Sequence, residues 1–297
     1  MYHVPVLAKE VIEALSIKKD GLYFDGTLGG GGHSELILSK GGRVIGTDRD
    51  ADAIAECEKR FKGYEGRYTL YKENFKNAKE ILKGQALDGA LLDLGVSSHQ
   101  IDTAERGMSY RLDGKLDMRM DQSQYLTALE VVGQYGETDL IRILKEYGEE
   151  RFAKRIAAAI VRERGVSPIA TTGRLVEIIK ASVPAFYQNP AMRSFMGIRL
   201  EVNNELRGLD MSIEEIFSYL ISGGRLCVIA FHSLEDRIVK RTFQRLSADC
   251  VCDKSLPVCV CNHKAEGRLL GRFRPSMAEL AVNSRSGSAT LRVLEKI

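Results

Sequence analysis

A glycine-rich turn at residues 25–33 (DGTLGGGGH) stands where a strand pattern gives way to a helical pattern. Glycines in such a turn let a ligand approach the backbone and tolerate a positive φ. The spacing does not match the dinucleotide fingerprint, which needs glycine at i, i+2 and i+5, and the phosphate-binding GxxxxGK(S/T) loop does not occur in the chain. The D-x-G-x-G-x-G turn of S-adenosylmethionine methyltransferases does fit at Asp25, Gly29 and Gly31, with Thr27 in place of its first glycine.

Three further residues follow this turn in a fixed order along the chain. Asp48 ends a second strand pattern, where an acid can accept hydrogen bonds from the two ribose hydroxyls of a nucleoside. Phe75 follows a third strand pattern, where a planar ring can lie against adenine, and Asp93 ends a fourth. Each residue alone is equally consistent with a turn acid or a core aromatic. The ordered series as a whole favours a nucleoside-binding crevice.

The residues near the fourth strand limit which kind of atom can accept the methyl group. A cytosine C5 methyltransferase needs a cysteine nucleophile near this strand, and no cysteine lies between Cys57 and Cys227. Many enzymes that methylate exocyclic amines place an (Asp/Asn)-Pro-Pro-aromatic segment here, whereas this chain has DLGVSS at 93–98. Direct transfer of the methyl group to a nitrogen or oxygen atom remains as the expected reaction. Asp93 is the first candidate for holding a target amine against the methyl group.

His232, after the strand pattern at 225–231, is the second catalytic candidate, as a hydrogen-bonding group or a proton acceptor. The same position suits the N-terminal cap of a helix that begins at Ser233, with Asp236 three residues further on. The sequence leaves both interpretations open.

Four cysteines crowd into twelve residues as two C-V-C segments: Cys250, Cys252, Cys259 and Cys261. Four thiolates suffice for one tetrahedral Zn²⁺, although the usual structural spacing is C-x2-C and C-x-C is less common. A reduced surface loop without metal is the alternative. We favour a structural zinc here but do not assign the metal from the sequence.

The elements that position these residues alternate between strands and helices. Strand patterns cover 21–25, 43–48, 68–72 and 86–93, and helical patterns cover 4–15, 34–40 and 50–61. Such alternation predicts βαβ units and a parallel sheet, in which ligands bind at the carboxyl ends of the strands.

A long interruption follows the fourth strand. The next buried strand, 225–231, comes after a helix predicted at 212–221 from a capping box of Ser212 and Glu215. The interval between Gly95 and Gly223 is too long for one crossover helix and contains helical patterns at 149–164 and 173–183. We therefore predict an α/β core formed by 1–105 and 208–297, ending in a strand at 289–295, with an all-helical substrate-recognition insertion at 106–207.

The composition is that of a globular protein. The chain has 297 residues, of which 44% are hydrophobic and 28% charged, and this excludes global disorder. No apolar stretch approaches the roughly 20 residues that cross a bilayer. The N-terminus MYHVPVLAKE lacks the basic and apolar regions of a secretory signal, so we expect a cytoplasmic protein. A net charge of +3 permits a polyanionic partner without requiring one.

The longer sequence runs resemble the RsmH (MraW) family, bacterial methyltransferases that modify N4 of cytosine 1402 in the decoding region of 16S ribosomal RNA. The runs are 3–7 (HVPVL), 25–34 (DGTLGGGGHS), 47–50 (TDRD), 91–98 (LLDLGVSS), 104–107 (AERG), 116–121 (LDMRMD), 147–160 (YGEERFAKRIAAAI) and 231–240 (FHSLEDRIVK). They extend through nearly the whole chain. The fold implied by the resemblance is a class I S-adenosylmethionine methyltransferase core, Rossmann-like and interrupted by a helical domain.

The resemblance also implies which residues contact the cofactor, S-adenosyl-L-methionine. These are Gly31, Gly32, His33, Asp48, Phe75, Asp93 and Gln100. Asp48, Phe75 and Asp93 follow from the order of strands as well, whereas His33 and Gln100 come from the family alone.

RNA contacts are expected from arginine and lysine side chains around the crevice. One set recurs along a predicted helix and comprises Arg237, Lys240, Arg241 and Arg245. A second set, in a predicted glycine-containing loop, comprises Arg268, Arg272 and Arg274. The segment 105–121, with Arg106, Tyr110 and Arg119, is predicted to be a mobile loop that closes over a flipped base. The residues that we expect to contact RNA are Arg106, Arg119, Arg237 and Lys240.

The prediction is thus an enzyme that methylates N4 of cytosine 1402 in 16S rRNA, with the 30S subunit as its partner and no membrane partner. One alternative is an enzyme acting on another amine, such as DNA cytosine; the absent Pro-Pro-aromatic segment disfavours it. Another is a non-catalytic RNA-binding or ribosome-assembly factor, against which the complete glycine turn, Asp48 and Asp93 argue. The sequence leaves the oligomeric state open, and also the choice between free rRNA and the assembled 30S particle.

Overall fold

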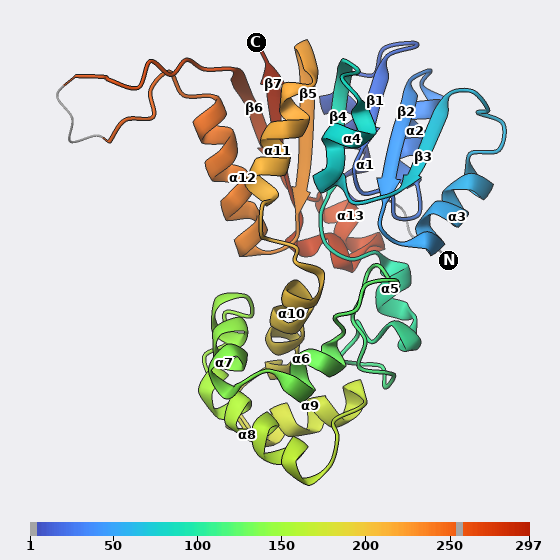
Figure 1. Ribbon diagram of the computed structural model, residues 1–297. Coiled ribbons are helices and arrows are strands. Elements are labelled where there is room, and N and C mark those ends of the chain that lie inside the picture. Colours follow the sequence, from blue (N-terminus) through green and yellow to red (C-terminus); the bar gives the residue numbers. More distant parts are fainter. Residues whose placement is uncertain (1–4, 254–257) are drawn as a thin grey trace. The chain divides into compact units, whose positions relative to one another are not determined.

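The computed structural model describes residues 5–253 and 258–297 (Figure 1). The chain forms two compact units: one covers Val96–Leu206, and the other combines the chain up to Gly95 with the chain from Arg207. The start of the predicted helix at 4–15, and part of the family run at 3–7, lie outside the described residues, and the helix α1 covers Ala8–Leu15. In the described part of the chain, no helix is both long and apolar enough to cross a membrane.

The discontinuous unit is built on a seven-stranded sheet with the order β3-β2-β1-β4-β5-β7-β6. The strands are β1 (Leu22–Asp25), β2 (Arg43–Asp48), β3 (Tyr68–Lys72), β4 (Leu87–Asp93), β5 (Leu220–Ala230), β6 (Gly267–Phe273) and β7 (Thr290–Lys296). Only the pairs that β7 makes with β5 and β6 are antiparallel. The direction of strand addition reverses between β1 and β4, which is the switch point where α/β sheets bind ligands. The α/β, Rossmann-like fold class predicted from the sequence is confirmed.

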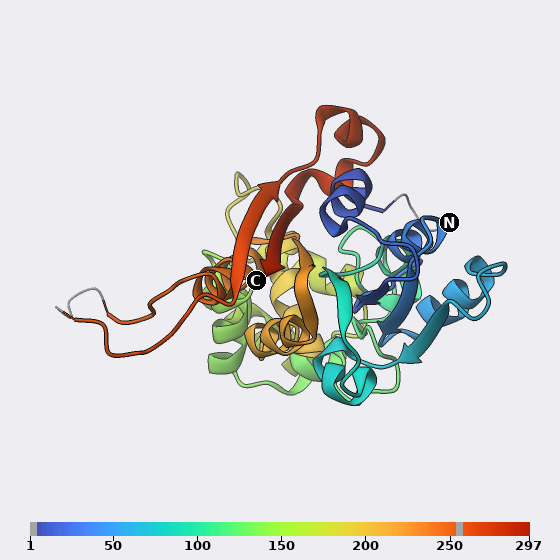
Figure 2. The ribbon, with the colours of Figure 1, turned by 90° about the horizontal axis from the view of Figure 1, so that it is seen from above.

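Helices cover both faces of this sheet (Figure 2). One face carries α1, α2 (Gly32–Ser39) and α3 (Ala51–Arg60). The other face carries α4 (Ala78–Leu82), α11 (Leu209–Ser218) and α12 (Ser233–Leu246). The short elements η1 (Phe75–Asn77), α13 (Met277–Val282) and η3 (Ser284–Ser288) complete the unit.

The inner strand β5 shows why the core has two layers. Its side chains alternate, so that Leu226 and Val228 pack on the α11 face while Cys227 and Ile229 pack on the α1 face. A strand that is buried on both faces has no polar side, and the unbroken apolar run of the sequence follows from this. Burying each large aliphatic side chain stabilises the fold by about 2 kcal/mol.

Two sequence predictions in this unit are wrong. The helix predicted at 212–221 begins at Leu209, and the hydroxyl of Ser212 bonds to the carbonyl of Gly208 inside the helix instead of capping it. The segment with Arg268 and Arg272, predicted as a loop, is the edge strand β6. Most of its side chains are exposed, so it has no apolar alternation that could reveal a strand.

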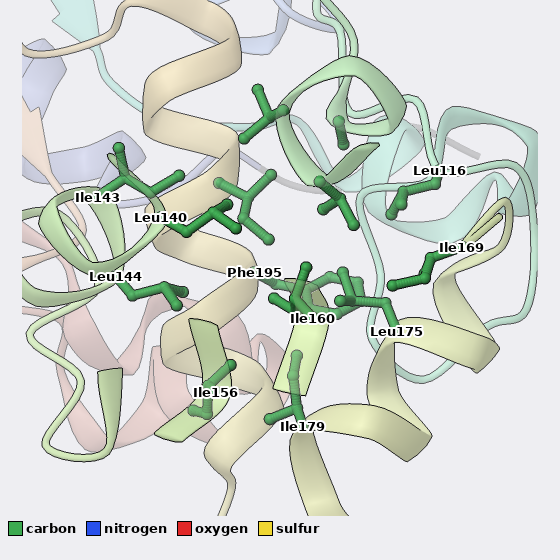
Figure 3. Close-up of a cluster of buried hydrophobic side chains, with 14 of the residues drawn as sticks. Leu116, Leu140, Ile143, Leu144, Ile156, Ile160, Ile169, Leu175, Ile179 and Phe195 are labelled. Carbon is green, nitrogen blue, oxygen red and sulfur yellow. The ribbon is translucent and has the colours of Figure 1, made fainter. Parts of the chain in front are cut away.

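The inserted unit, Val96–Leu206, is described in full, and its only β structure is one isolated bridge between Lys115 and Thr171. Its helices are α5 (Ser98–Asp102), η2 (Ala104–Arg106), α6 (Ala128–Gln134), α7 (Glu137–Glu146), α8 (Ala153–Val166), α9 (Thr172–Ala181) and α10 (Pro190–Asn203). Helices α6 to α10 share a core of their own, in which Leu140, Ile160 and Phe195 point toward one another (Figure 3).

Candidate active site

Three carboxylates end three neighbouring strands of the sheet. Asp25 ends β1, Asp48 ends β2 and Asp93 ends β4. Strand β1 lies between the other two and is parallel to both, with Asp25 paired to Gly46 on β2 and to Leu91 on β4. The carboxyl ends of parallel strands meet at one edge, so the three acids gather at the switch point.

The turn after β1 is packed too closely for side chains at its key glycines. A Cβ atom at Gly26 would lie 2.5 Å from Leu92 and 2.8 Å from the Cβ of Phe75. Gly31, with φ +75°, precedes α2, and a Cβ atom there would lie 2.8 Å from the sulfur of Cys57. The glycines are therefore required for both backbone conformation and packing.

Thr27 joins this turn to the end of β4. Its hydroxyl accepts a hydrogen bond from the backbone N–H of Asp93 at 2.5 Å, and its own N–H donates to Oδ1 of Asp25 at 3.1 Å. The other carboxylate oxygen of Asp25 accepts a 2.6 Å bond from the hydroxyl of Ser34, in the first turn of α2. Asp25 is 1% exposed, and these two hydrogen bonds to its buried carboxylate fix the shape of the turn.

Asp48 is held by two backbone donors. Its Oδ2 accepts from the N–H of Gly29 at 2.8 Å, and its Oδ1 accepts from the N–H of Asp50 at 2.9 Å. A carboxylate oxygen has two lone pairs, so each oxygen keeps one for a further donor. Two adjacent hydroxyls, as on a ribose, are suitable donors.

Burial raises the pKa of all three carboxyl groups. It raises the pKa of Asp25 to about 6, against the opposing hydrogen bond from Ser34. Burial raises the pKa of Asp93 well above its ordinary value, and the negative charges of Asp25 and Glu235 raise it further. Burial also raises the pKa of Asp48. A group of carboxyls in this state favours a cation as its ligand, because a positive charge would stabilise their ionised forms.

His33 lies beside Asp93 at the start of α2. Its Nε2 is 3.7 Å from Oδ2 of Asp93, and the residue is 6% exposed. Burial lowers the pKa of His33 to about 4, against the opposing effect of the Val6 backbone, so the imidazole is neutral at neutral pH. The structure therefore places His33 next to Asp93, and contact of Gly31, His33 and Asp93 with the cofactor stays a prediction.

Phe75 and His232 have local structural roles. Phe75 is 8% exposed and belongs to the core cluster on the α11 face, with its Cβ next to Gly26. His232 is the N-cap of α12, where its Nδ1 accepts from the N–H of Glu235 at 3.4 Å, and its Nε2 lies 3.1 Å from Oε1 of the same residue. The capping interpretation of His232 is thus the one that the structure shows, and its role as a proton acceptor stays a prediction.

Comparison with known proteins identifies the family. The whole chain, residues 1–297, matches the model of the MraW methylase family. The chain belongs to this family. It is 48% identical to the Ribosomal RNA small subunit methyltransferase H of Clostridioides difficile (strain 630) over 308 residues, which covers 100% of this chain and 99% of the relative. A protein of the same name from Lachnospira eligens is 49% identical over 307 residues, with 99% and 98% covered.

Membership of the MraW methylase family confirms S-adenosyl-L-methionine as the cofactor, and the site fits this molecule. Oδ1 of Asp93 is buried and accepts no hydrogen bond from the described residues, so a polar ligand group would satisfy it. The three carboxyls with raised pKa values suit a sulfonium cation, and Asp48 suits a ribose.

The inserted unit of this methylase contains three further predicted site residues: Gln100, Arg106 and Arg119. Gln100 closes a capping box, in which its side chain accepts from the N–H of Ser97 at 3.1 Å. Arg119 is paired with Asp117 at 2.7 Å. We still predict that Gln100 contacts the cofactor and that Arg119 contacts RNA.

The burial of Arg106 contradicts the RNA contact expected of it. The residue is 3% exposed, and its guanidinium donates to the carbonyls of Arg119 and Met120 at 3.2 and 2.8 Å. The segment 105–121 is also anchored, because Leu116 and Met118 are buried in the core of the inserted unit. Arg106 therefore holds this segment together from inside and does not face a phosphate.

Basic side chains of the methyltransferase core do reach the surface. Arg237 and Lys240 on α12 are exposed, as are Arg241 on the same helix and Arg272 on β6. Since α12 packs against β6, these four residues belong to neighbouring elements. They form a basic surface that is suited to phosphate contacts.

Two residues of the site have no signal strong enough to be found by sequence reasoning. Ser34 bonds to buried Asp25, and Glu235 is 2% exposed, with its Oε2 accepting from the N–H of Phe231 at 3.0 Å. The only trace of Glu235 in the sequence is its position three residues after His232, which is that of a capping box.

Proposed function

We propose that this methyltransferase transfers a methyl group from S-adenosyl-L-methionine to N4 of cytosine 1402 in 16S rRNA, within the small ribosomal subunit. The relatives that cover its full length are named ribosomal RNA small subunit methyltransferases. The sequence runs that resemble the RsmH family support the finer assignment to N4 of this cytosine. The observation that carries the proposal is Asp93, a carboxylate with an unsatisfied oxygen at the end of β4.

The cofactor would be held by the turn after β1 and by the acids beside it. Asp48 would accept the ribose hydroxyls on its free lone pairs, and Gly31, Gly32 and His33 would line the approach at the start of α2. The ring of Phe75, at the edge of the hydrophobic core, would lie against the adenine. S-adenosyl-L-methionine supplies a methyl group that is already activated by its bond to a sulfonium sulfur.

Asp93 would position the acceptor. Its carboxylate accepts a hydrogen bond from the N4 amine and so holds the nitrogen lone pair in line with the methyl group. The S–CH₃ bond breaks as the N4–CH₃ bond forms, the electron pair of the broken bond returns to sulfur, and the nitrogen then gives up one proton to a base or to water. Because the sulfonium is a good leaving group, positioning carries most of the catalysis, and His232 stays a candidate acceptor only for the proton that leaves the nitrogen.

RNA recognition would be shared by both units. The basic surface formed by Arg237, Lys240, Arg241 and Arg272 supplies phosphate contacts on the core. We assign substrate recognition to the helical insertion predicted at 106–207, which has a hydrophobic core of its own. Its Arg119 stays in the set of proposed RNA contacts.

The proposal is tested by methyl transfer from labelled S-adenosyl-L-methionine to 30S subunits that lack the modification, with the product nucleoside identified by mass spectrometry. We expect N4-methylcytidine at position 1402, and we expect Asp93→Ala to abolish it. Asp88→Asn changes an acid at the opposite end of β4 and should retain transfer. Free 16S rRNA and DNA are offered in parallel.

Other outcomes would replace the proposal. Transfer to DNA, or to another atom of the RNA, would assign another acceptor. Cofactor binding without transfer to any of these substrates would also refute the acceptor. Failure to bind the cofactor at all would favour a non-catalytic assembly factor.

A further inference from the structure

The connection between α12 and β6 brings the sulfur atoms of four cysteines close together. It leaves the core as two adjacent segments, seen as the long orange extension in both views (Figures 1 and 2). The sulfur atoms belong to Cys250, Cys252, Cys259 and Cys261, and all of them lie within 4.8 Å of one another. None of these cysteines has a part in the proposed methyl transfer.

The distances between the sulfurs are those of a tetrahedral metal site. The separations are 3.9 Å for Cys252–Cys259, 3.6 Å for Cys259–Cys261 and 3.8 Å for Cys261–Cys250. Four sulfurs placed tetrahedrally at about 2.3 Å from a Zn²⁺ ion are about 3.8 Å apart. A disulfide would require about 2.05 Å, so these thiols are not disulfide pairs.

The backbone of each C-V-C segment supports the sulfurs of the other. The N–H of Val251 donates to the sulfur of Cys261 at 3.5 Å, and the N–H of Val260 donates to the sulfur of Cys252 at 3.4 Å. The two segments thus make the same cross-contact in both directions. Amide donors directed at sulfur stabilise the thiolate form, which is the form that binds a metal.

Apolar packing contributes little to this connection. Between residues 247 and 266, no described side chain is buried, and Val251, Val258 and Val260 are 46%, 70% and 72% exposed. Hydrogen bonds close its base, where the N–H of Glu266 donates to the carbonyl of Leu246 at 2.8 Å. A segment without a core needs another source of order, and a bound metal is the common solution.

We propose that Cys250, Cys252, Cys259 and Cys261 bind one structural Zn²⁺ ion, which fastens the two C-V-C segments together. All four positions are filled by protein sulfur, so the site leaves no open position for catalysis. A multi-iron cluster is disfavoured because its cysteine sulfurs would stand around several metal atoms, farther apart than these. The zinc site does not depend on the proposed methyl transfer.

The first test is the metal content of the full chain, purified without chelators or metal-affinity resin and measured by mass spectrometry. We expect one zinc per chain. The variant Cys250→Ser/Cys259→Ser, which removes one ligand from each segment, should contain none, while Val258→Ser, a change to serine directly before the second segment, should keep the zinc. Retained binding of S-adenosyl-L-methionine would show that the core of the cysteine variant is folded.

Cobalt provides a second readout. When Co²⁺ replaces zinc in the full chain, a tetrathiolate site gives the visible bands and thiolate charge-transfer absorption of tetrahedral cobalt. Removal of the metal should also increase protease cleavage between Asp249 and Glu266. Zinc far below one per chain in the freshly purified wild type would overturn the proposal. So would iron in place of zinc, or equal zinc in the wild type and the double variant.

Discussion

The hydroxyl of Thr27 accepts a hydrogen bond from the backbone N–H of Asp93 at 2.5 Å. This bond links the turn after β1 to the end of β4 across the switch point of the sheet. It explains why threonine replaces the first glycine of the D-x-G-x-G-x-G turn: glycine has no hydroxyl for this N–H. The departure from the motif thus helps to fix the backbone of the proposed catalytic carboxylate.

Replacing Thr27 with valine, which has the same shape, should leave the N–H of Asp93 without its acceptor. An unsatisfied backbone donor costs about 1–3 kcal/mol, so kcat/KM for methyl transfer should fall roughly ten-fold. Thr27→Ser keeps the hydroxyl and should stay near the wild-type rate. Equal rates for the valine and serine variants would show that the bond has no part in transfer.

Asp93→Asn should lower the rate of methyl transfer about 100-fold or more, because a neutral amide polarises the amine less than a carboxylate. Since burial raises the pKa of Asp93, the wild-type rate should rise with pH as this carboxyl ionises. The variant should lose that rise. Single-turnover rates across a pH series test both statements, and a variant with an unchanged pH profile would contradict them.

Asp48→Asn should weaken binding of S-adenosyl-L-methionine about ten- to a hundred-fold, because hydrogen bonds to a charged acceptor are worth about 1.5–3 kcal/mol. Isothermal titration calorimetry measures this directly. Asp52→Asn, an exposed acid in the first turn of α3, is the matched control and should bind normally. Similar affinities for the two variants would remove Asp48 from the cofactor site.

Asp25 should make the protein less stable as the pH rises from about 4 to about 6. Burial raises its pKa from 3.8 to about 6 in the folded state, so the folded form binds the proton more tightly than the unfolded form does. The stabilisation is complete below the lower value and is lost by the upper one, a change of about 3 kcal/mol. Asp25→Asn should lack this component in urea unfolding series, whereas the exposed Asp210→Asn should retain it. Parallel curves for wild type and Asp25→Asn would refute the prediction.

Arg237→Gln and Lys240→Gln should weaken RNA binding and lower the slope of log K against log salt by about one each. Both residues are exposed on α12. Lys59→Gln, an exposed lysine of α3 on the other face of the sheet, should leave the slope unchanged. A slope for the α12 variants equal to that of Lys59→Gln would exclude α12 from the RNA interface.

The sequence by itself determined the strands that carry the site. Asp25, Asp48 and Asp93 each end an apolar run. Apolar periodicity is a local pattern, so it can be read from the sequence without knowledge of the fold. The strands β2 and β3 fall at their predicted residues for the same reason. The sequence runs that resemble the RsmH family predicted the cofactor. A long series of motifs in a fixed order is specific to one family, whereas a single acid is not.

Only the tertiary structure decided what surrounds each side chain. Arg106 looked like a phosphate ligand, yet it is buried against two carbonyls, and the exposed edge strand β6 has no apolar alternation to reveal it. The C-x-C spacing gave weak support to a metal, but only the fold shows that the two short segments lie side by side and bring the sulfurs of Cys250 and Cys261 to 3.8 Å. Burial and pKa depend on residues far apart in the chain, and the metal geometry depends on how a loop folds back on itself; no apolar periodicity encodes either.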